Sequence, residues 1–337
     1  MDPIKKRNLF QGLGIIALLA LALLVFNPVR SLLSFRENDQ VPLYTMTYHG
    51  PYYYLTPLIP YSDANLQKYS DRYLPEDEFG LFEHQACTIF SATGGDHKIY
   101  GRNRDLPWNH TALLLFTHPQ NGYASVSMVD LDQLGVFPGR FSLWRRLLLL
   151  AAPLVPTEGM NEHGLTISKA DVSPDDPPFD PSKETLMFRT AMRLVLDQAK
   201  TTQEAVDLLA LYNISFAGGG GHLLIADPSG DSAILEYFDD QVVVIRNPDP
   251  WQVVTNFEVG NPANQDLEPN CQRYNLVEDA LEKSEGVLNI ESGMDLLKQA
   301  SVSGTLWSIS FDMTTQKLDL VLHRQYDQVL HLTRDDW

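Results

Sequence analysis

Two arginines and an aspartate follow a cysteine at short range. Cys87 begins the apolar run "CTIFSA", while Arg102, Arg104 and Asp105 belong to the segment "GRNRD". A thiol attacks efficiently only as the thiolate, and a neighbouring cation favours that form. An antiparallel pairing of "CTIFSA" with "KIYGRN" around the turn "TGGD" would fold the Arg102 end back toward Cys87. The spacing fits a reactive cysteine with activating charges, or a core cysteine beside a surface ion pair.

Three later segments carry polar side chains that could complete such a site. "GMNEHGL" is a turn that offers His163, either as a catalytic group or as a solvated turn residue. "VVTNFEV" places Asn256 at the end of a strand, where its amide could donate to an oxyanion or simply terminate the strand. Arg273 lies in the first turn of a helix, an unfavourable place for a cation. Its partner is then a distant carboxylate, a substrate or solvent.

Composition excludes several other functions. The chain has 43 acidic and 25 basic residues and a net charge of −18, which repels phosphate backbones, so we expect no nucleic-acid partner. Cys87 and Cys271 can form at most one disulfide. No Cys/His cluster has the spacing of a structural zinc site, and we predict neither a metal nor a cofactor.

Short apolar or alternating runs, broken by turn residues, predict strands after residue 86. They cover residues 86–92, 97–103, 112–118, 124–130, 165–171, 222–237 (two strands), 241–247, 251–257, 305–313 and 317–323. Helical spacing predicts helices over 182–200, 201–212 and 270–283, and another helix after Ser292. Thr201 and Glu204 occupy capping-box positions, and Asn270 and Ser292 are the expected caps of the later helices. This order predicts an α+β domain of two antiparallel sheets packed face to face, with helices outside.

The N-terminal part divides into three segments. Residues 1–8 form a basic head, and residues 9–26 form an apolar run just long enough to span a bilayer. We predict an uncleaved transmembrane anchor, with a cleaved signal as the alternative, and an extracytoplasmic catalytic domain that is membrane-anchored or secreted. Residues 27–86, rich in Tyr and Pro, are expected to be an ordered but irregular arm or prosegment. Residues 87–337 form one catalytic domain, because no later boundary is visible.

The segment "SLWRRLLLLAAPLVP" is unusually apolar for a connection between strands. If it lies in a loop, Leu147 and Leu148 would wall an acyl-chain pocket or dip into the membrane. The alternative is an ordinary buried helix of the domain.

Taken together, the motifs "CT", "GRNRD", "GMNEHGL", "ADPSGDSAILE", "VVTN" and "QRYNLVEDAL" resemble the linear amide C–N hydrolases. This family includes choloylglycine hydrolase, penicillin V acylase, acid ceramidase relatives and the isopenicillin N acyltransferase group. They are N-terminal-nucleophile (Ntn) hydrolases with an αββα fold. The resemblance runs from Cys87 to the C-terminus.

The resemblance implies a role for each matching residue. Cys87 is the nucleophile and must become the first residue of the mature chain, so the Ala86–Cys87 bond is a processing site. The α-amine that cleavage frees is the base, with a pKa near the working pH. The remaining matches are the thiolate-holding Arg102, the amine-binding Asp105, the oxyanion donor Asn256 and the distal Arg273.

One position departs from the family pattern. Some members have an oxyanion-assisting Asn where this chain has Asp171, and a carboxylate would repel an oxyanion. We therefore assign Asp171, together with Leu147 and Leu148, to substrate binding.

The predicted reaction is hydrolysis of a linear, non-peptide amide of a small N-acyl substrate through a thioester. An amine in place of water would give acyl transfer. A non-catalytic, membrane-tethered binding protein is the rival from another class. The acyl part, the amine part and the oligomeric state stay open.

Overall fold

The computed structural model describes residues 26–39, 41–53, 86–106, 110–136, 143–172, 177–216, 220–246, 248–261 and 271–337. The basic head and nearly all of the predicted membrane segment, residues 1–25, lie outside this part of the chain, as does the expected cap Asn270. Over the described ranges, no helix is both long enough and apolar enough to cross a bilayer.

Most strands belong to two sheets. The larger sheet has nine strands in the order β1-β2-β5-β6-β7-β8-β11-β12-β13. Its strands are β1 (Arg36–Glu37), β2 (Tyr44–His49), β5 (Ala112–His118), β6 (Ser125–Asp130), β7 (Pro156–Asn161), β8 (Thr166–Val172), β11 (Gly220–Ala226), β12 (Ser232–Phe238) and β13 (Gln241–Ile245). The smaller sheet has six strands in the order β14-β3-β4-β15-β16-β17. Its strands are β14 (Trp251–Val254), β3 (Ala86–Ala92), β4 (Ile99–Asp105), β15 (Thr305–Asp312), β16 (Lys317–Leu322) and β17 (Leu330–Leu332).

Side-chain alternation along the strands builds one core between the two sheets and others outside them. In β5, Leu114 packs in the cluster shared with the smaller sheet, whereas Leu113 and Leu115 pack in a cluster on the opposite face. The shared cluster also contains Cys87 and Trp307. The interior between the sheets is therefore where the predicted nucleophile lies.

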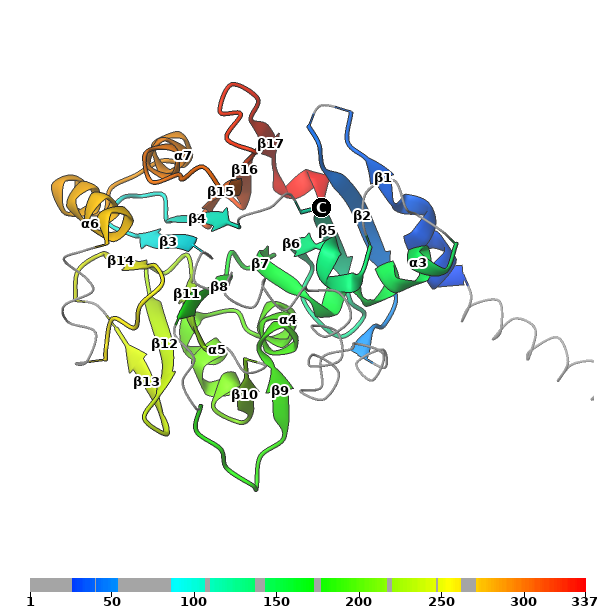
Figure 1. Cartoon of the computed structure of the whole chain (residues 1–337), viewed down its shortest axis with the longest axis horizontal. Coiled ribbons are helices and arrows are strands. Elements are labelled where there is room, and N and C mark those ends of the chain that lie inside the picture. Colours follow the sequence, from blue (N-terminus) through cyan, green and yellow to red (C-terminus); the bar gives the residue numbers. More distant parts are fainter. Residues whose placement is uncertain are drawn as a thin grey trace, which may run out of the picture.

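Helices cover the outer faces of both sheets (Figure 1). Helices α4 (Phe188–Gln198) and α5 (Thr202–Leu209) pack on the larger sheet, beside the short parallel pair β9 (Thr185–Met187) and β10 (Asn213–Ser215). Helices α6 (Gln272–Ser284) and α7 (Ile290–Gln299) pack on the smaller sheet. The short helices are α3 (Leu143–Leu148), η3 (Leu131–Leu134), η4 (Leu149–Leu154) and η7 (Arg334–Asp336). The predicted pair of packed sheets with helices outside is confirmed, but the larger sheet is not purely antiparallel, because β2 pairs with β5 in parallel.

The described part of the N-terminal arm is regular, contrary to the expected irregular segment. Residues 26–34 are helical, and β2 joins the larger sheet by parallel pairing with β5, with Tyr44 opposite Leu113. Met46 and Tyr48, on alternate positions of β2, are each 1% exposed. The period-two pattern of "YTMTYH" fits a strand, but its partner lies far along the chain, where local sequence carries no signal.

Several helix ends differ from expectation. The predicted 182–200 helix starts later, because residues 185–187 form β9. Thr201 does cap α5 by accepting from the Glu204 N–H at 3.2 Å, as predicted. The Glu204 side chain accepts from the Lys200 N–H and not from Thr201, so the predicted capping box is only half formed. The cap of α7 is Asn289, with Ser292 at its third position, so the assignment of Ser292 as the cap was wrong. Reciprocal bonds between these two residues make the capping box.

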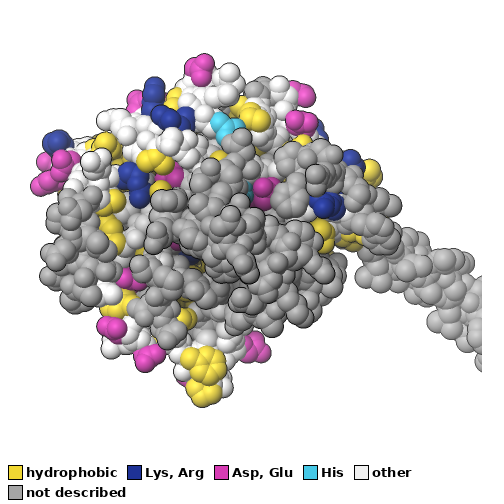
Figure 2. All heavy atoms as spheres, viewed as in Figure 1, with side chains coloured by type: hydrophobic (Ala, Val, Ile, Leu, Met, Phe, Trp, Pro, Cys, Tyr) yellow, Lys and Arg dark blue, Asp and Glu magenta, His cyan; other side chains and the backbone are white. Residues whose placement is uncertain are grey.

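The surface reflects the acidic composition of the chain. On the face shown in Figure 2, Asp and Glu side chains are spread around the outline instead of gathering in one patch. Cationic side chains are nevertheless concentrated inside, next to Cys87, as the next section describes.

Candidate active site

The predicted β3–β4 hairpin is present and sets the register of the site. Cys87 lies opposite Arg104, and Ile89 lies opposite Arg102. On the next strand, Trp307 lies opposite Arg104. Residues directly opposite on neighbouring strands share one face of a sheet. Cys87, Arg104 and Trp307 therefore form a cross-strand row on the face that looks into the core between the sheets.

Arg102 points one guanidinium nitrogen at the Cys87 sulfur. Its Nη2 lies 3.8 Å from Sγ, and both residues are fully buried. The rest of the guanidinium is fixed, because Nε lies 2.6 Å from Glu158 Oε2 and Nη1 donates to the Lys169 carbonyl at 2.6 Å. The structure therefore holds a cation against the sulfur of the predicted nucleophile.

Asn256 and Arg273 hold the backbone of Cys87. The Cys87 N–H donates to Asn256 Oδ1 at 2.8 Å, and Arg273 donates to the Cys87 carbonyl. Arg273 also donates to Asn256 Oδ1 at 3.0 Å, and Asn256 Nδ2 donates to the Asp171 carbonyl at 2.8 Å. A side-chain amide has two N–H donors, so one N–H of Asn256 stays free of this bond. The structure thus brings Asn256 and Arg273 to Cys87.

Asp105 lies beside the bond that precedes Cys87. Its backbone pairs with Ala86 across the β3–β4 hairpin. Its Oδ1 accepts from Thr305 Oγ1 at 2.6 Å, while the buried Oδ2 has no hydrogen-bond partner among the described residues. Burial raises the pKa of Asp105 above its ordinary value, although Thr305 and nearby arginines oppose that shift. The carboxyl group is placed to accept one more donor.

Asp171 is held ionised by cations. Lys169 forms an ion pair with one of its oxygens, and Arg104 Nη1 lies 3.9 Å from the other. Burial favours the neutral form, but the charges of Lys169 and Arg104 outweigh it and lower the pKa of Asp171 to about 2. This explains how a carboxylate is tolerated at a position where the resemblance implied an amide.

Two predicted residues lie elsewhere. Leu147 and Leu148 lie on α3 and are 42% and 43% exposed. The cluster next to them, which includes Leu149, contains Leu113 and Leu115, on the face of the larger sheet that points away from Cys87. The structure does not bring these leucines to the thiol.

The turn residue His163 is also not part of the Cys87 group. It lies in the turn that joins β7 to β8, and its ring packs edge-on against the Tyr123 ring, with the ring centroids 4.4 Å apart. Asp171, which contacts the site, lies near the other end of β8.

Sequence reasoning missed Glu158, Lys169 and Trp307. Glu158 forms an ion pair with Arg102 through Oε2 and accepts a hydrogen bond from the Trp307 indole N–H through Oε1. It lies two residues before Met160 on β7, and both face the core between the sheets, so alternation could have flagged a buried acid there. Lys169 offered a similar signal as a lone cation within the apolar strand "LTISKAD".

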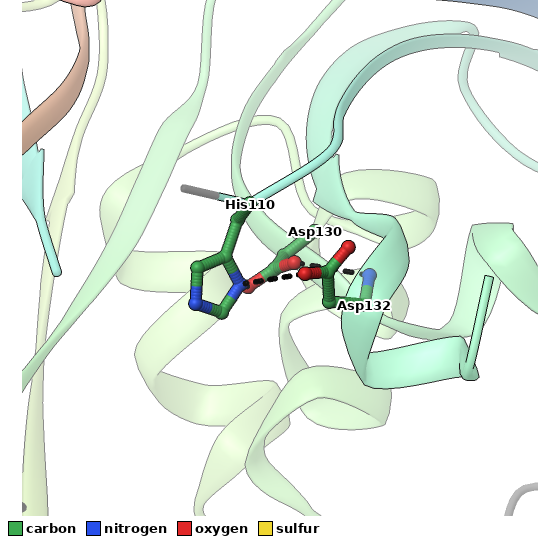
Figure 3. A group of neighbouring side chains, drawn as sticks. All are labelled: His110, Asp130 and Asp132. Carbon is green, nitrogen blue, oxygen red and sulfur yellow. Dashed lines mark hydrogen bonds and ion pairs between the residues drawn. The ribbon is translucent and has the colours of Figure 1, made fainter. Parts of the chain in front are cut away.

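A separate group of metal-binding residue types comprises His110, Asp130 and Asp132 (Figure 3). The imidazole points at the two carboxylates, with Nδ1 2.7 Å from Asp130 Oδ2 and 3.8 Å from Asp132 Oδ2. Imidazole and carboxylates are common zinc ligands. Asp130 lies within ion-pair distance of the imidazole, so in this arrangement the group is a His–Asp pair.

Comparison with solved structures shows the same fold in amide hydrolases. Penicillin V acylase from Agrobacterium tumefaciens matches with a TM-score of 0.54 at 20% identity, over 74% of this chain and 86% of that one. A mutant of conjugated bile acid hydrolase from Clostridium perfringens matches with a TM-score of 0.56 at 14% identity, over 75% and 93%. A second variant of that hydrolase gives 0.52 at 13% identity, over 74% and 93%. A search of curated proteins found no match.

A family comparison covers more than half of the chain. Residues 92–327 match the family described as acyl-coenzyme A:6-aminopenicillanic acid acyl-transferase. The match begins five residues after Cys87, within β3. It includes Arg102, Asp105, Asn256 and Arg273. Together with the shared fold, it confirms the predicted resemblance to the linear amide C–N hydrolases. The chain belongs to the acyl-coenzyme A:6-aminopenicillanic acid acyl-transferase family.

Proposed function

We propose that this chain is an αββα Ntn enzyme that hydrolyses a linear amide bond of a small N-acyl substrate through Cys87. The observation that carries the proposal is the double placement of Cys87. Its sulfur faces the fixed Arg102 guanidinium, and its backbone nitrogen is held by Asn256 beside the Asp105 strand position. A residue that acts as both nucleophile and base needs its sulfur and its nitrogen positioned together.

The first step is cleavage of the Ala86–Cys87 bond. The Cys87 sulfur attacks the Ala86 carbonyl carbon, the C–N bond breaks, and the freed nitrogen takes the thiol proton. Water then hydrolyses the resulting thioester, which releases the Ala86 carboxylate and restores the thiol. The new amine lies next to Asn256 Oδ1, and the unpartnered Asp105 Oδ2 is available to bind it.

Turnover repeats this chemistry on the substrate. The α-amine accepts the thiol proton as the sulfur attacks the amide carbonyl. The remaining Asn256 N–H donates to the developing oxyanion, and the leaving amine takes the proton as the C–N bond breaks. Water attacks the thioester, which gives the free acid and regenerates the thiol. Arg102 stabilises the sulfur whenever it is anionic.

Acyl transfer is the second candidate, favoured by the family to which residues 92–327 belong. An amine that reaches the thioester before water would take the acyl group. Product analysis with and without an added amine separates the two reactions, since only acyl transfer yields a new amide.

We also propose that the catalytic domain is extracytoplasmic and tied to a membrane through residues 9–26. The basic head, with Lys5, Lys6 and Arg7, and the apolar run after it support this proposal. Fractionation of cells that express the full chain would test it, and recovery in the cytosol would overturn it.

Intact mass measurement tests the cysteine mechanism. The wild-type chain is expected to yield a fragment that begins at Cys87, and Cys87→Ala should stay uncut and inactive. Cys271→Ser is the matched control, because Cys271 is the only other cysteine and should leave cleavage intact. An uncut wild-type chain, or a Cys87→Ala variant with full activity, would overturn the proposal.

A further inference from the structure

We propose that Arg104, supported by Lys169, binds an anionic group, preferably a carboxylate, on the amide substrate, and so determines specificity. This inference rests on the proposed role of Cys87 and adds the substrate class. The enzyme would then act on N-acyl amides that carry a carboxylate a few bonds from the scissile amide.

The position of Arg104 places its side chain next to the reaction. It lies directly opposite Cys87 on β4 and opposite Trp307 on β15. Side chains at such positions have Cβ atoms about 4.5–5.5 Å apart and interact. Arg104 is only 5% exposed, on the face that carries the thiol. A substrate carbonyl at the sulfur therefore brings its neighbouring groups within reach of the guanidinium.

Arg104 differs from its neighbours in how its charge is matched. Arg102 has Glu158 at 2.6 Å, and Lys169 has Asp171. For Arg104, the ion-pair contact is with Asp171 Oδ2 at 3.9 Å, too long for a hydrogen bond. Its buried Nε has no hydrogen-bond partner in the described part of the chain. The same is true of Arg102 Nε, but Arg102 makes hydrogen bonds through Nη1 and Nη2. Buried charges are normally paired and hydrogen-bonded, so this guanidinium has donors left for a ligand.

The local charge favours an anion. Arg104 and Lys169 share the carboxylate of Asp171. Glu158 and Asp130 also act on Arg104, but they lie against Arg102 and His110. The group therefore carries excess positive charge within a chain of net charge −18. Asp171 stays ionised, because its pKa is about 2, and so it neutralises one positive charge of this group. Arg189 adds a further cation that acts on the same carboxylate. A concentrated positive potential at a reaction centre selects anionic ligands.

The shape of the donors favours a carboxylate among anions. A guanidinium presents planar, paired N–H donors that match a carboxylate. The exposure of Asp171 indicates the side from which a ligand can reach Arg104, since the Asp171 side chain is 31% exposed and that of Arg104 is 6% exposed. An incoming carboxylate would meet Arg104 from the side on which Asp171 lies, and would give it the close partner that Asp171 does not.

Matched amide pairs test the inference. The two amides of a pair have equal length, and one ends in a carboxylate while the other ends in the neutral carboxamide. In one series this end group is on the acyl part of the amide, and in the other series it is on the amine part. The wild-type enzyme should prefer the carboxylate in one series, mainly through KM. Arg104→Leu should reduce that preference by about 10- to 100-fold, the usual effect of losing a hydrogen bond to a charged group. Arg104→Lys should restore part of it.

A control variant and a processing assay keep the outcomes separate. Arg246→Leu removes a surface arginine paired with Asp231 and should keep the preference for the carboxylate. Cleavage before Cys87, read by mass, reports folding and the proposed function independently of the anion.

Equal kcat/KM for carboxylate and carboxamide in both series, in a processed wild-type enzyme that turns over neutral amides, would overturn the inference and leave the proposed function standing. An unprocessed, inactive wild type would remove both. If Arg104→Leu does not fold, inhibition of the wild-type enzyme by product analogues tests the inference instead. Carboxylate product analogues should inhibit at least about tenfold better than their carboxamides, and equal inhibition would contradict the inference.

Discussion

At the scale of single residues, the site depends on cations whose partners differ. Arg102 lies 2.6 Å from Glu158, and it donates to a backbone carbonyl and to the Cys87 sulfur. The sequence predicted that Arg102 would approach Cys87, because hairpin register is local. It could not predict Glu158 as the partner, because that residue comes from the opposite sheet through packing between the layers.

Replacing Arg102 should slow thiol modification. In Arg102→Ala the thiolate loses its fixed cation, so the mature protein should react more slowly with a small alkylating reagent near neutral pH. The measurement is the rate of mass increase on the fragment that begins at Cys87. Arg246→Ala is the control for loss of a surface arginine. An unchanged rate in a folded Arg102→Ala protein would argue against this role.

The ionised Asp105 carboxylate is expected to lower the stability of the fold, although the proposed reaction needs it. Burial raises its pKa above the ordinary 3.8, so the folded state binds this proton more tightly than the unfolded state does. Its contribution to stability is therefore present at low pH and is lost as pH rises from about 3.8 through the raised folded pKa. Asp105→Asn can still accept from Thr305 and has no charge to bury.

We therefore expect the uncut Asp105→Asn precursor to unfold at an equal or higher urea concentration than the uncut Cys87→Ala precursor above this pH range. Below pH 3.8 the difference should vanish. Denaturant titrations at several pH values measure it. Processed enzyme should be lost in Asp105→Asn, since a neutral amide binds the α-ammonium poorly. A variant that is less stable only at high pH would contradict this account.

At the scale of elements, the β3–β4 hairpin carries the site, and its packing leaves no room at one position. Gly101 lies opposite Phe90, and a Cβ on Gly101 would come within 2.3 Å of the Phe90 ring. Gly101→Ala should therefore destabilise the fold by about 1–3 kcal/mol, as overpacking commonly does. Thermal unfolding checks this, and Gly101→Ala combined with Phe90→Leu should recover part of the loss. No recovery would mean that the clash is not with the ring.

Local sequence predicted most elements but not their long-range partners. Strands β3, β5 and β15 follow from apolar runs, and the α5 cap follows from Thr201. Local signals failed where tertiary contacts decide. The parallel β2–β5 pairing and the Lys169–Asp171–Arg104 group each join segments that no short motif connects. Alternation along β8 revealed the strand but not the cations that gather at its end.

At the scale of the whole molecule, the N-terminal arm is part of the larger sheet. Besides β2, Tyr52 and Tyr53 each donate to Asp197 Oδ2, at 2.5 and 2.6 Å. Asp197 also pairs with the buried Arg193 at 3.1 Å. Cleavage at Ala86–Cys87 would thus leave residues 26–53 bound without a covalent link, and any membrane anchor ahead of them would still hold the catalytic domain.

This retention is testable on the processed protein. Native mass spectrometry should show the two fragments together, and denaturing conditions should separate them. Tyr52→Phe with Tyr53→Phe removes two hydrogen bonds to a charged acceptor, worth about 1.5–3 kcal/mol each, so the fragments should separate at lower urea. Tyr326→Phe is the control, because Tyr326 lies in the turn between β16 and β17 and its hydroxyl bonds to Ser308 on the smaller sheet. Fragments that separate in buffer alone would contradict the arrangement.

The β2–β5 pairing makes refolding of the cut enzyme different from folding of the uncut chain. In the uncut chain, a strand that begins at Tyr44 meets one that begins at Ala112 as an intramolecular event. Once the bond before Cys87 is cut, the same pairing must be rebuilt by collision of two separate molecules, so its rate depends on their concentration. An enzyme matured this way would refold slowly, if at all, after denaturation, and its lifetime would be set by how fast it unfolds.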